Sequence, residues 1–397
     1  MLKQLLFISA FILYANAFHF ATGQLAQGRK ELAAIAVDDY IVFAGGIGKN
    51  NDYSSTVDIY SFEKDSWTQA ELSQGRNQLT ATSLNGLAYF AGGYNGYKYS
   101  DVIDIWDDFI KDWQVGYLSV PRAKLAATSA GEEVLFAGGF NNLNCSAVVD
   151  IYNDTDAHWY TATLSEARFG LAATSVYDVA IFAGGHNNTG LTVAVDIYNA
   201  TTYVWTTGYL SEARVYLSAA SVGNKAYFAG GSLADGNYST HIDVYDVITG
   251  EWSLLFLSEG RSHFIVAALG DLLVFAGGLN DSSIVEIYDT VSDTTEFADL
   301  GIQRMYLAAA SYDTTVFIGG GVDSNNSLPT VVEELSFNST ETTTTGSSST
   351  GWTTGWTTGS STTGEVTGTS GTTGHDHHKV KNINIRQLTY ARLMYTL

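Results

Sequence analysis

The chain has almost no cysteine, little proline and few cations. Its 397 residues include one cysteine, Cys145, which excludes an internal disulfide and a cysteine-based zinc site. Proline occurs twice, and 19 Lys and Arg face 41 Asp and Glu, for a formal charge of −22. Nucleic acid and anionic membranes repel such a surface, so we expect neither as a partner.

Patterns for metals, cofactors and catalysis are scarce as well. His19, His158, His186, His241 and His263 are spread singly, without the paired spacing of metal ligands. The segment 375–378, His-Asp-His-His, is interpreted as part of a solvated tail. No Gly-x-Ser-x-Gly, phosphate loop or dinucleotide fingerprint occurs. We predict no metal, no cofactor and no enzymatic activity.

One phrase, Phe-Ala-Gly-Gly, is repeated along the chain. Six copies begin at Phe43, Phe90, Phe136, Phe182, Phe228 and Phe275, and we assign a seventh, altered copy to Phe317–Gly320. The period is about 46 residues, which indicates a repeat architecture. Abundant aromatic residues (13%) and glycines favour short strands with tight turns over helices.

Each repeat has the same internal order. An arginine precedes a run of small residues, a strand ending in the double glycine, a variable loop, Val-Asp-Ile-Tyr or a variant of it, and a tryptophan seven residues past the tyrosine position. This order predicts four short antiparallel strands per repeat. It resembles the kelch motif over residues 18–337, which implies an all-β, seven-bladed kelch-type β-propeller.

The last repeat lacks a fourth strand, and the N-terminus of the mature chain is expected to supply it. Phe20-Ala21-Thr22-Gly23-Gln24-Leu25 matches the segment 205–210, Trp-Thr-Thr-Gly-Tyr-Leu, position for position. Residues 18–25 are therefore predicted to close the ring and remove an exposed edge. In the sixth repeat Thr295 stands at the tryptophan position, and we expect Phe297 to fill the space between blades instead.

The two ends of the chain differ in composition from the repeats. Residues 1–17 have a lysine, an apolar run and a small-x-small ending, which predicts a secretory signal peptide. Residues 338–378 are rich in Ser, Thr and Gly, have a His-rich end and are predicted to be a disordered stalk, and residues 379–397 form a short basic tail of unknown structure. An extracellular, monomeric propeller without membrane insertion is expected.

Asparagines that could carry glycans are frequent, as in secreted chains. Eight acceptors occur, at Asn144, Asn153, Asn187, Asn199, Asn237, Asn280, Asn325 and Asn338. In repeats three to seven one of them lies in the loop after the double glycine, whereas repeats one and two have none there. Their loops instead contain Tyr53, Tyr94, Tyr97, Lys98 and Tyr99, which we hypothesise to form a binding edge free of glycans.

Two further sets of residues are candidates for a role in binding. The repeat arginines are interpreted as structural, each tied to an acid or to carbonyls within its blade: Arg29, Arg76, Arg122, Arg168, Arg214, Arg261 and Arg304. Two residues beyond each arginine the sequence varies from repeat to repeat, and Lys124, Tyr216, His263 and Tyr306 at these positions are candidate ligand contacts near the axis. Solvated residues lining a wet channel are the alternative.

The sequence as a whole favours a secreted or cell-surface binding module. Its partner would be an extracellular protein or glycan, held by variable loops on one propeller face. Two alternatives stay open: an extracellular enzyme, either an oxidase or a sugar-modifying propeller, and a structural coat or matrix protein. The architecture resembles that of galactose oxidase, but the cysteine, tyrosine and histidine ligands of its copper site have no counterpart here.

Overall fold

The computed structural model describes residues 18–337, except residues 143 and 280–282. The predicted signal peptide, the stalk, the basic tail, Asn280 and Asn338 lie outside the described residues. Within the described part of the chain, no helix combines the length and the apolar character that a membrane crossing requires.

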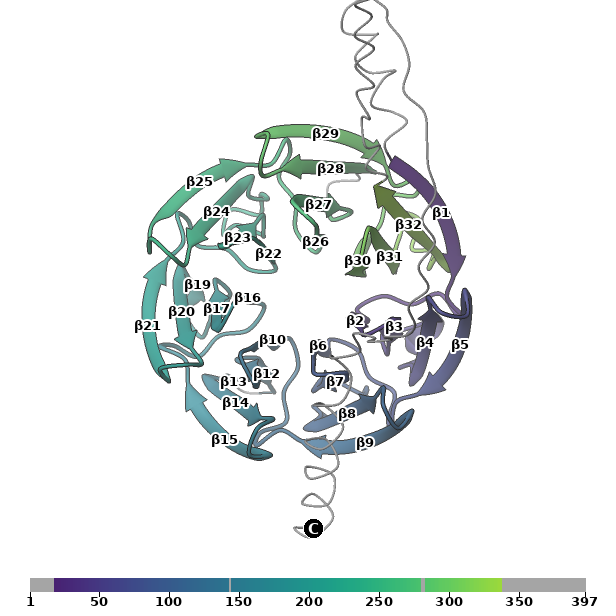
Figure 1. Cartoon of the computed structure of the whole chain (residues 1–397), viewed down its shortest axis with the longest axis horizontal. Helices are drawn as coiled ribbons and strands as arrows, with labels where there is room; N and C mark the ends of the chain where they lie inside the picture. The colour runs from purple at the N-terminus through teal and green to yellow at the C-terminus, as the bar shows by residue number, and fades with distance from the viewer. Residues whose placement is uncertain (1–17, 143, 280–282, 338–397) are drawn as a thin grey trace, which may run out of the picture. The chain divides into compact units, whose positions relative to one another are not determined.

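Seven four-stranded antiparallel sheets, the blades, surround a central axis (Figure 1). Blade 1 contains β2 (Ala33–Val37), β3 (Tyr40–Ala44), β4 (Thr56–Ser61) and β5 (Ser66–Glu71). Blade 2 contains β6 (Thr80–Leu84), β7 (Leu87–Ala91), β8 (Val102–Asp107) and β9 (Asp112–Tyr117). Blade 3 contains β10 (Ala126–Ala130), β11 (Glu133–Ala137), β14 (Val148–Asn153) and β15 (His158–Thr163). Blade 4 contains β16 (Ala172–Val176), β17 (Val179–Ala183), β20 (Ala194–Asn199) and β21 (Val204–Tyr209).

The remaining blades follow the same plan. Blade 5 contains β22 (Ser218–Val222), β23 (Lys225–Ala229), β24 (His241–Asp246) and β25 (Trp252–Phe256). Blade 6 contains β26 (Ile265–Leu269), β27 (Leu272–Ala276), β28 (Ile284–Asp289) and β29 (Thr294–Asp299). Blade 7 contains β30 (Met305–Tyr312), β31 (Thr315–Val322), β32 (Val331–Phe337) and β1 (Phe18–Gln24). Loop elements are η1 (Lys49–Asn51) and the hairpins β12 (Phe140–Asn141) with β13 (Asn144–Cys145) and β18 (His186–Asn187) with β19 (Gly190–Leu191).

The core consists of seven apolar clusters, most of which lie between neighbouring blades. The second strand of each blade is the most buried, because both of its faces pack against neighbours; Ile41, Val42, Phe43 and Ala44 have no exposed surface. Outer-strand tryptophans reach the phenylalanines of the double-glycine phrase, with ring centroids 6.1–6.3 Å apart in blades 1 to 5. The first strand of each blade lies nearest the axis (Figure 1).

The N-terminal strand closes the ring, as the sequence predicts. β1 lies beside β32 in blade 7 (Figure 1), and their antiparallel register runs from Phe18 opposite Phe337 to Gln24 opposite Val331. Phe20 pairs with Leu335. The equivalent pair is tryptophan with tyrosine in blades 1, 3, 4 and 5, tryptophan with tryptophan in blade 2, and threonine with tyrosine in blade 6. The equivalence drawn from residues 20–25 is therefore confirmed.

Two finer expectations for the last blades are wrong. The glycines of blade 7 that adopt the positive φ of the other pairs are Gly320 (70°) and Gly321 (94°), so the seventh copy is shifted by one residue from Phe317–Gly320. With this shift the first glycine stands 16 positions after the repeat arginine in every blade, and Glu333 takes the position of the third-strand acid. Phe297 is 52% exposed and does not fill the space between blades, because that stretch of the edge strand faces solvent.

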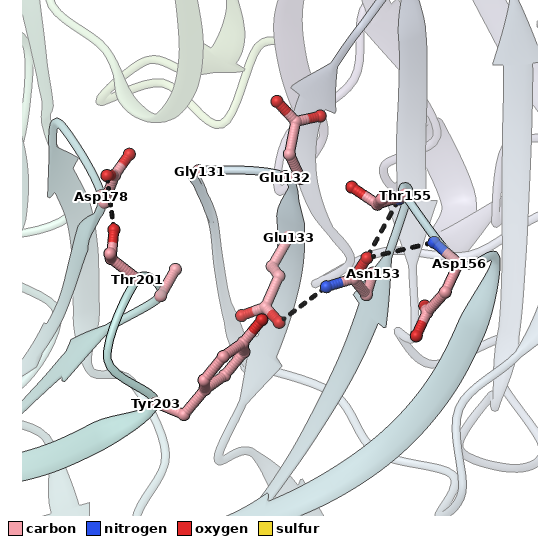
Figure 2. A pocket seen from close by; sticks show the side chains of 10 residues that line it. Gly131, Glu132, Glu133, Asn153, Thr155, Asp156, Asp178, Thr201 and Tyr203 are labelled. Atoms are coloured by element: carbon pink, nitrogen blue, oxygen red, sulfur yellow. Dashed lines mark hydrogen bonds between the residues drawn. The ribbon is translucent and has the colours of Figure 1, made fainter. Parts of the chain in front are cut away.

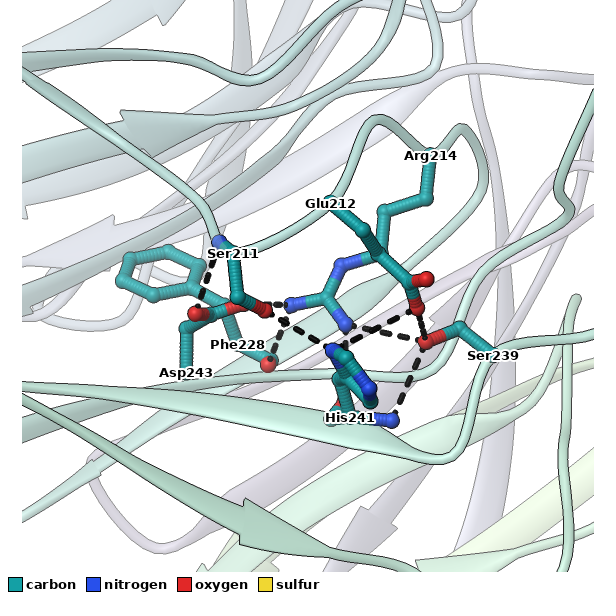
Figure 3. Close-up of polar contacts among 7 residues, drawn as sticks. All are labelled: Ser211, Glu212, Arg214, Phe228, Ser239, His241 and Asp243. Atoms are coloured by element: carbon teal, nitrogen blue, oxygen red, sulfur yellow. Dashed lines mark hydrogen bonds and ion pairs between the residues drawn. The ribbon is translucent and has the colours of Figure 1, made fainter.

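Each repeat arginine is buried and fastened within its own blade. In blades 1 to 5 the arginine pairs with the aspartate of the third strand, at 2.6–2.7 Å in blades 1 to 4, and in blade 7 Arg304 pairs with Glu333. In blade 6 Arg261 pairs with Glu259 instead, 2.8 Å away, and Glu286 accepts the backbone N–H of Ser258. Figure 3 shows the blade 5 network, where Arg214 also donates to the carbonyl of Phe228 and to Ser239.

The closure by β1 predicts that alanine substitution destabilises the protein at Gly23 but not at the equivalent glycine of blade 2. A Cβ at Gly23 would lie 2.9 Å from Trp67 Nε1, whereas a Cβ at Gly116, the same position in blade 2, would make only ordinary contacts from 3.6 Å. We expect Gly23→Ala to lower the free energy of unfolding by about 1–3 kcal/mol through overpacking, and Gly116→Ala to change it by less than about 0.5 kcal/mol. Equal effects in denaturant titrations of the two variants would contradict the packing of β1.

Removal of the closing strand is the coarser test. Deletion of residues 18–25 takes away the partner of β32 and the buried Leu25, whose N–H donates to the carbonyl of Thr330 at 2.8 Å. We expect the melting temperature, measured by calorimetry, to fall sharply. An unchanged melting temperature would refute the closure.

Candidate functional site

Seven residues form a closed ring of backbone hydrogen bonds around the axis. Each stands two positions after a repeat arginine, and the N–H of one donates to the carbonyl of its counterpart in the preceding blade over 2.9–3.4 Å. The members are Glu31, Gln78, Lys124, Gly170, Tyr216, His263 and Tyr306. Because both backbone groups are used, the variable side chains are what this ring offers to a ligand.

This ring lines a cavity of about 450 Å³, which we call the axial mouth. The residue after each ring member is large and apolar and also lines the cavity: Leu32, Leu79, Leu125, Leu171, Leu217, Phe264 and Leu307. A volume of this size is typical of small-ligand pockets. Lys124, Tyr216, His263 and Tyr306, singled out from the sequence, are all brought together here.

All seven ring members have left-handed backbone conformation. Their φ angles lie between 54° and 65°, and only Gly170 avoids the Cβ cost of that region. A left-handed backbone costs an ordinary residue about 1 kcal/mol. Six side chains are therefore present where glycine would be the less strained residue.

A lysine from blade 3 reaches across Gly170 to blade 5. Lys124 Nζ donates to the hydroxyl of Tyr216 at 2.9 Å and lies 5.4 Å and 5.3 Å from the ring centroids of Phe169 and Tyr216. A Cβ at Gly170 would lie 3.0 Å from the ring of Tyr216, so this glycine makes room for the bridge. The ammonium thus lies close to the ring of Phe169 and is bonded to the hydroxyl of Tyr216, within a chain that is otherwise strongly acidic.

The imidazole of His263 is neutral in the mouth. Burial, and secondarily the charge of Lys124, lowers the pKa of His263 to about 4. The hydroxyl of Ser262 accepts from Ser232 at 2.8 Å and lies 3.1 Å from His263 Nδ1. A neutral imidazole has one donor and one acceptor nitrogen, so His263 is an uncharged hydrogen-bonding group for a ligand.

An acceptor stands on the blade 1 side. Glu31 Oε2 accepts from the amides of Asn77 and Gln78, the latter at 3.2 Å. Hydrogen-bonding side chains of Lys124, Tyr216 and His263 from blades 3, 5 and 6 face a carboxylate from blade 1, so the mouth offers both donors and acceptors. Such a site orients a ligand that has both donor and acceptor groups.

Eight aromatic side chains form a continuous series around the mouth, which we call the aromatic arc. Consecutive ring centroids lie 4.2–6.3 Å apart, with every blade contributing: Tyr53, Tyr94, Tyr99, Phe140, Phe169, Tyr216, His263 and Tyr306. The sequence reading included six of these and missed Phe140 and Phe169. Phe140 directly follows a double glycine and Phe169 a repeat arginine, so comparison of those two positions across the repeats would have found them.

In the two tyrosine-containing loops of blades 1 and 2, only some of the side chains are exposed to a ligand. Tyr53, Tyr94 and Tyr99 pack on one another in the arc and are half-buried. Tyr97 is 94% exposed and Lys98 is exposed beside it, on a loop that Asn95 Oδ1 holds by accepting both of their N–H groups. These loops and those entering the first strands share one side of the propeller, the loop face, as the bridges Lys30–Ile47 and Asn77–Tyr94 show.

The acceptor asparagines divide between the two faces. Asn144, Asn187, Asn237 and Asn325 lie in loops of the loop face, in blades 3, 4, 5 and 7. Asn153 and Asn199 lie at the tight turns of the opposite side, the turn face. The loop-face sector of blades 1 and 2 carries no acceptor in its sequence.

A serine, a histidine and a glutamate meet in blade 5 without forming a catalytic relay (Figure 3). Ser211 Oγ lies 2.9 Å from His241 Nδ1, and Glu212 Oε1 lies 3.6 Å from the same nitrogen. A nucleophile and an orienting acid need opposite ring nitrogens. Across the described residues no group of three or more His, Cys, Asp or Glu is placed to hold a metal.

These features define a seven-bladed β-propeller with a cavity on its axis. Residues 28–71 and 213–255, which contain blade 1 and blade 5, match the family model of the kelch motif. Among solved structures, that of YjhT aligns with a TM-score of 0.55 and 15% identity, over 70% of this chain and 99% of that one. No curated protein matches the sequence. The other blades repeat the same arginine and double glycine, so the chain is a seven-bladed β-propeller that carries kelch motifs.

The neutral His263 predicts a pH dependence of stability. Its folded pKa of about 4 lies below the ordinary value of 6.5, so the unfolded chain takes up the proton first and stability is lost as pH falls from 6.5 toward 4. We expect His263→Gln to reduce the loss in unfolding free energy between pH 7.5 and 4.5 by about 1–2 kcal/mol. His158→Gln, at an exposed position in blade 3, is the control, and an unaltered pH profile of His263→Gln would contradict the assignment.

Proposed function

We propose that this kelch propeller is an extracellular, non-catalytic binding module that holds part of a protein or glycan ligand in the axial mouth. A kelch propeller is a binding scaffold, and a ligand site on a repeat scaffold is sought where the repeats differ. The signal-like residues 1–17 and the eight glycan acceptors support the extracellular placement.

One observation carries the proposal. Six of the seven mouth residues keep a side chain in a backbone conformation that favours glycine, and Gly170 demonstrates that glycine is compatible with the ring. Backbone strain of this kind clusters at ligand sites as well as at tight turns, and the ring members combine it with a place in the cavity. Lys124, Tyr216, His263 and Tyr306 are therefore assigned to ligand binding rather than to the scaffold.

The arc and the polar groups suggest how a ligand is held. Aromatic rings offer contact area at low entropic cost to sugar faces and to peptide side chains alike. Lys124 and the tyrosine hydroxyls would donate, Glu31 would accept, and the neutral imidazole of His263 would make a further hydrogen bond. Tyr97 and Lys98, exposed at the rim, would make secondary contacts with a ligand that extends toward blade 2.

Replacement by glycine separates binding from stability. We expect Lys124→Gly and Tyr216→Gly to keep the stability of the parent within about 1 kcal/mol, because relief of left-handed strain offsets the lost contacts. Binding of a ligand found with the full chain on a glycan array or by pull-down from extracellular fluid should weaken at least about tenfold, equal to about 1.4 kcal/mol.

A tyrosine on the other side of the propeller is the matched control. Tyr177 is also left-handed, with φ 52°, and is 67% exposed on the turn face. Tyr177→Gly should leave the affinity unchanged. Equal affinity of parent, Lys124→Gly and Tyr216→Gly, measured by titration calorimetry, would refute a site in the mouth, and turnover of the captured ligand would favour an enzyme.

A further inference from the structure

A second cavity lies between blades 3 and 4 on the turn face. Its volume is about 410 Å³, and Figure 2 shows the side chains around it. The lining comes from four tight turns and consists of Gly131, Glu132, Glu133, Asn153, Thr155, Asp156, Asp178, Ala200, Thr201 and Tyr203. This cavity shares no lining residue with the axial mouth.

Two glycan acceptor sequences meet at this cavity. Asn153 and Thr155 of one sequence line it, as do Ala200 and Thr201 of the other. Asn153 itself faces the cavity, whereas Asn199 does not line it. Among the described acceptors these are the two on the turn face.

The amide of Asn153 is held in one orientation. Its Nδ2 donates to Glu133 Oε1 at 3.1 Å, and its Oδ1 accepts the backbone N–H groups of Thr155 and Asp156 at 3.0 Å and 3.3 Å (Figure 2). One N–H of Nδ2 is thus used inward. The second is the one that a bond to a sugar replaces.

The acceptor of that inward bond is itself fixed. Glu133 is 1% exposed, and its carboxylate also accepts the hydroxyls of Tyr160 at 2.5 Å and Tyr198 at 2.8 Å. Burial first, and the hydrogen bond to Glu133 next, raises the pKa of the Tyr160 hydroxyl, which keeps it protonated as a donor. A satisfied buried network of this kind rigidifies the asparagine attached to it.

The rest of the lining suits a sugar. Tyr203 presents a ring that is 63% exposed, and carboxylates of Glu132, Asp156 and Asp178 offer acceptors for hydroxyl and amide protons. Asp178 Oδ2 already accepts the hydroxyl of Thr201 at 2.7 Å. An aromatic face with surrounding acceptors is the usual composition of a site for a neutral polyol.

We propose that this cavity holds the first N-acetylglucosamine of a glycan attached to Asn153, as a built-in part of the interface between blades 3 and 4. In the transfer, Asn153 Nδ2 bonds to C1 of the sugar, the bond from C1 to a lipid-linked pyrophosphate donor breaks, and the amide loses one proton. The inference rests on the proposed extracellular placement, since the donor belongs to the secretory pathway.

Resistance of the native glycan to removal is the first test. The full chain is produced in a eukaryotic secretory host, and its glycans are released before and after denaturation with a peptide N-glycanase, an amidase that hydrolyses the Cγ–Nδ2 bond of the asparagine. We expect glycopeptide mass spectrometry to find Asn153 occupied and its glycan released at least about tenfold more slowly from the native protein than those of Asn237 or Asn325, because a sugar packed in the cavity must leave it before the enzyme can bind it. After denaturation the rates should agree.

The outcomes separate this inference from the proposed function. If Asn237 and Asn325 carry glycans and Asn153 does not, the proposal for the cavity fails and the proposed extracellular placement stands. The same holds if the glycan of Asn153 is released as fast as the others. If no acceptor of the secreted preparation is occupied, the extracellular placement and this inference both fail.

A stability comparison is independent of the amidase. Thr155→Ala removes the hydroxyl that glycan transfer requires and keeps the N–H that Asn153 binds. When variant and parent are both made in the secretory host, we expect the variant to have the lower melting temperature. When both are made in bacteria, we expect their melting temperatures to be equal. Asn325→Gln, on an exposed loop, should change the melting temperature in neither host. An equal fall in both hosts would overturn the proposal.

Discussion

The buried arginine of each repeat is the interaction on which the rest of the propeller depends. Its guanidinium pairs with an acid of its own blade in six blades, while its carbonyl accepts the N–H of the second glycine of the preceding blade, as from Gly46 to Arg76 and from Gly321 to Arg29. The paired aspartate also accepts the N–H of the incoming segment, as Asp104 does from Ser73. One residue per repeat thus ties blade, linker and neighbour together, and the charge is compensated where it is desolvated.

That arrangement positions the axial mouth. Two residues after the arginine the chain must turn back toward the first strand, and the left-handed ring member makes this turn while its N–H and carbonyl bond to the two adjacent blades. The same geometry recurs seven times, so the backbone around the axis is fixed whatever side chain is present. The glycine pairs follow for a related reason: a Cβ at Gly45 would lie 2.7 Å from the carbonyl oxygen of Arg76.

Much of this was predictable from the repeats, and what failed has a physical cause. The match of residues 20–25 to an outer strand gave the correct closure, because strand register follows the pattern of wedge residues. The seventh glycine pair was misassigned because three glycines stand in a row, Gly319 to Gly321, and the phenylalanine-like residue is Ile318; the constant 16-residue spacing from the arginine decides the register. The contacts of Phe140 and Phe169 join different blades, and only the closed ring brings them together.

The separation of constant from variable positions explains how a scaffold of this kind can hold a specific ligand. Residues that are not β-branched tolerate the left-handed conformation at a modest cost, so exchange of Lys124 or Tyr216 among them changes the chemistry of the mouth and leaves the backbone ring intact. The buried arginine and its acid allow no such exchange, because removal of either partner leaves an unpaired charge at a cost of about 3–5 kcal/mol. Specificity therefore resides in the side chains of the ring members, which the fold does not need. Each stands two positions after the repeat arginine, which the fold does need.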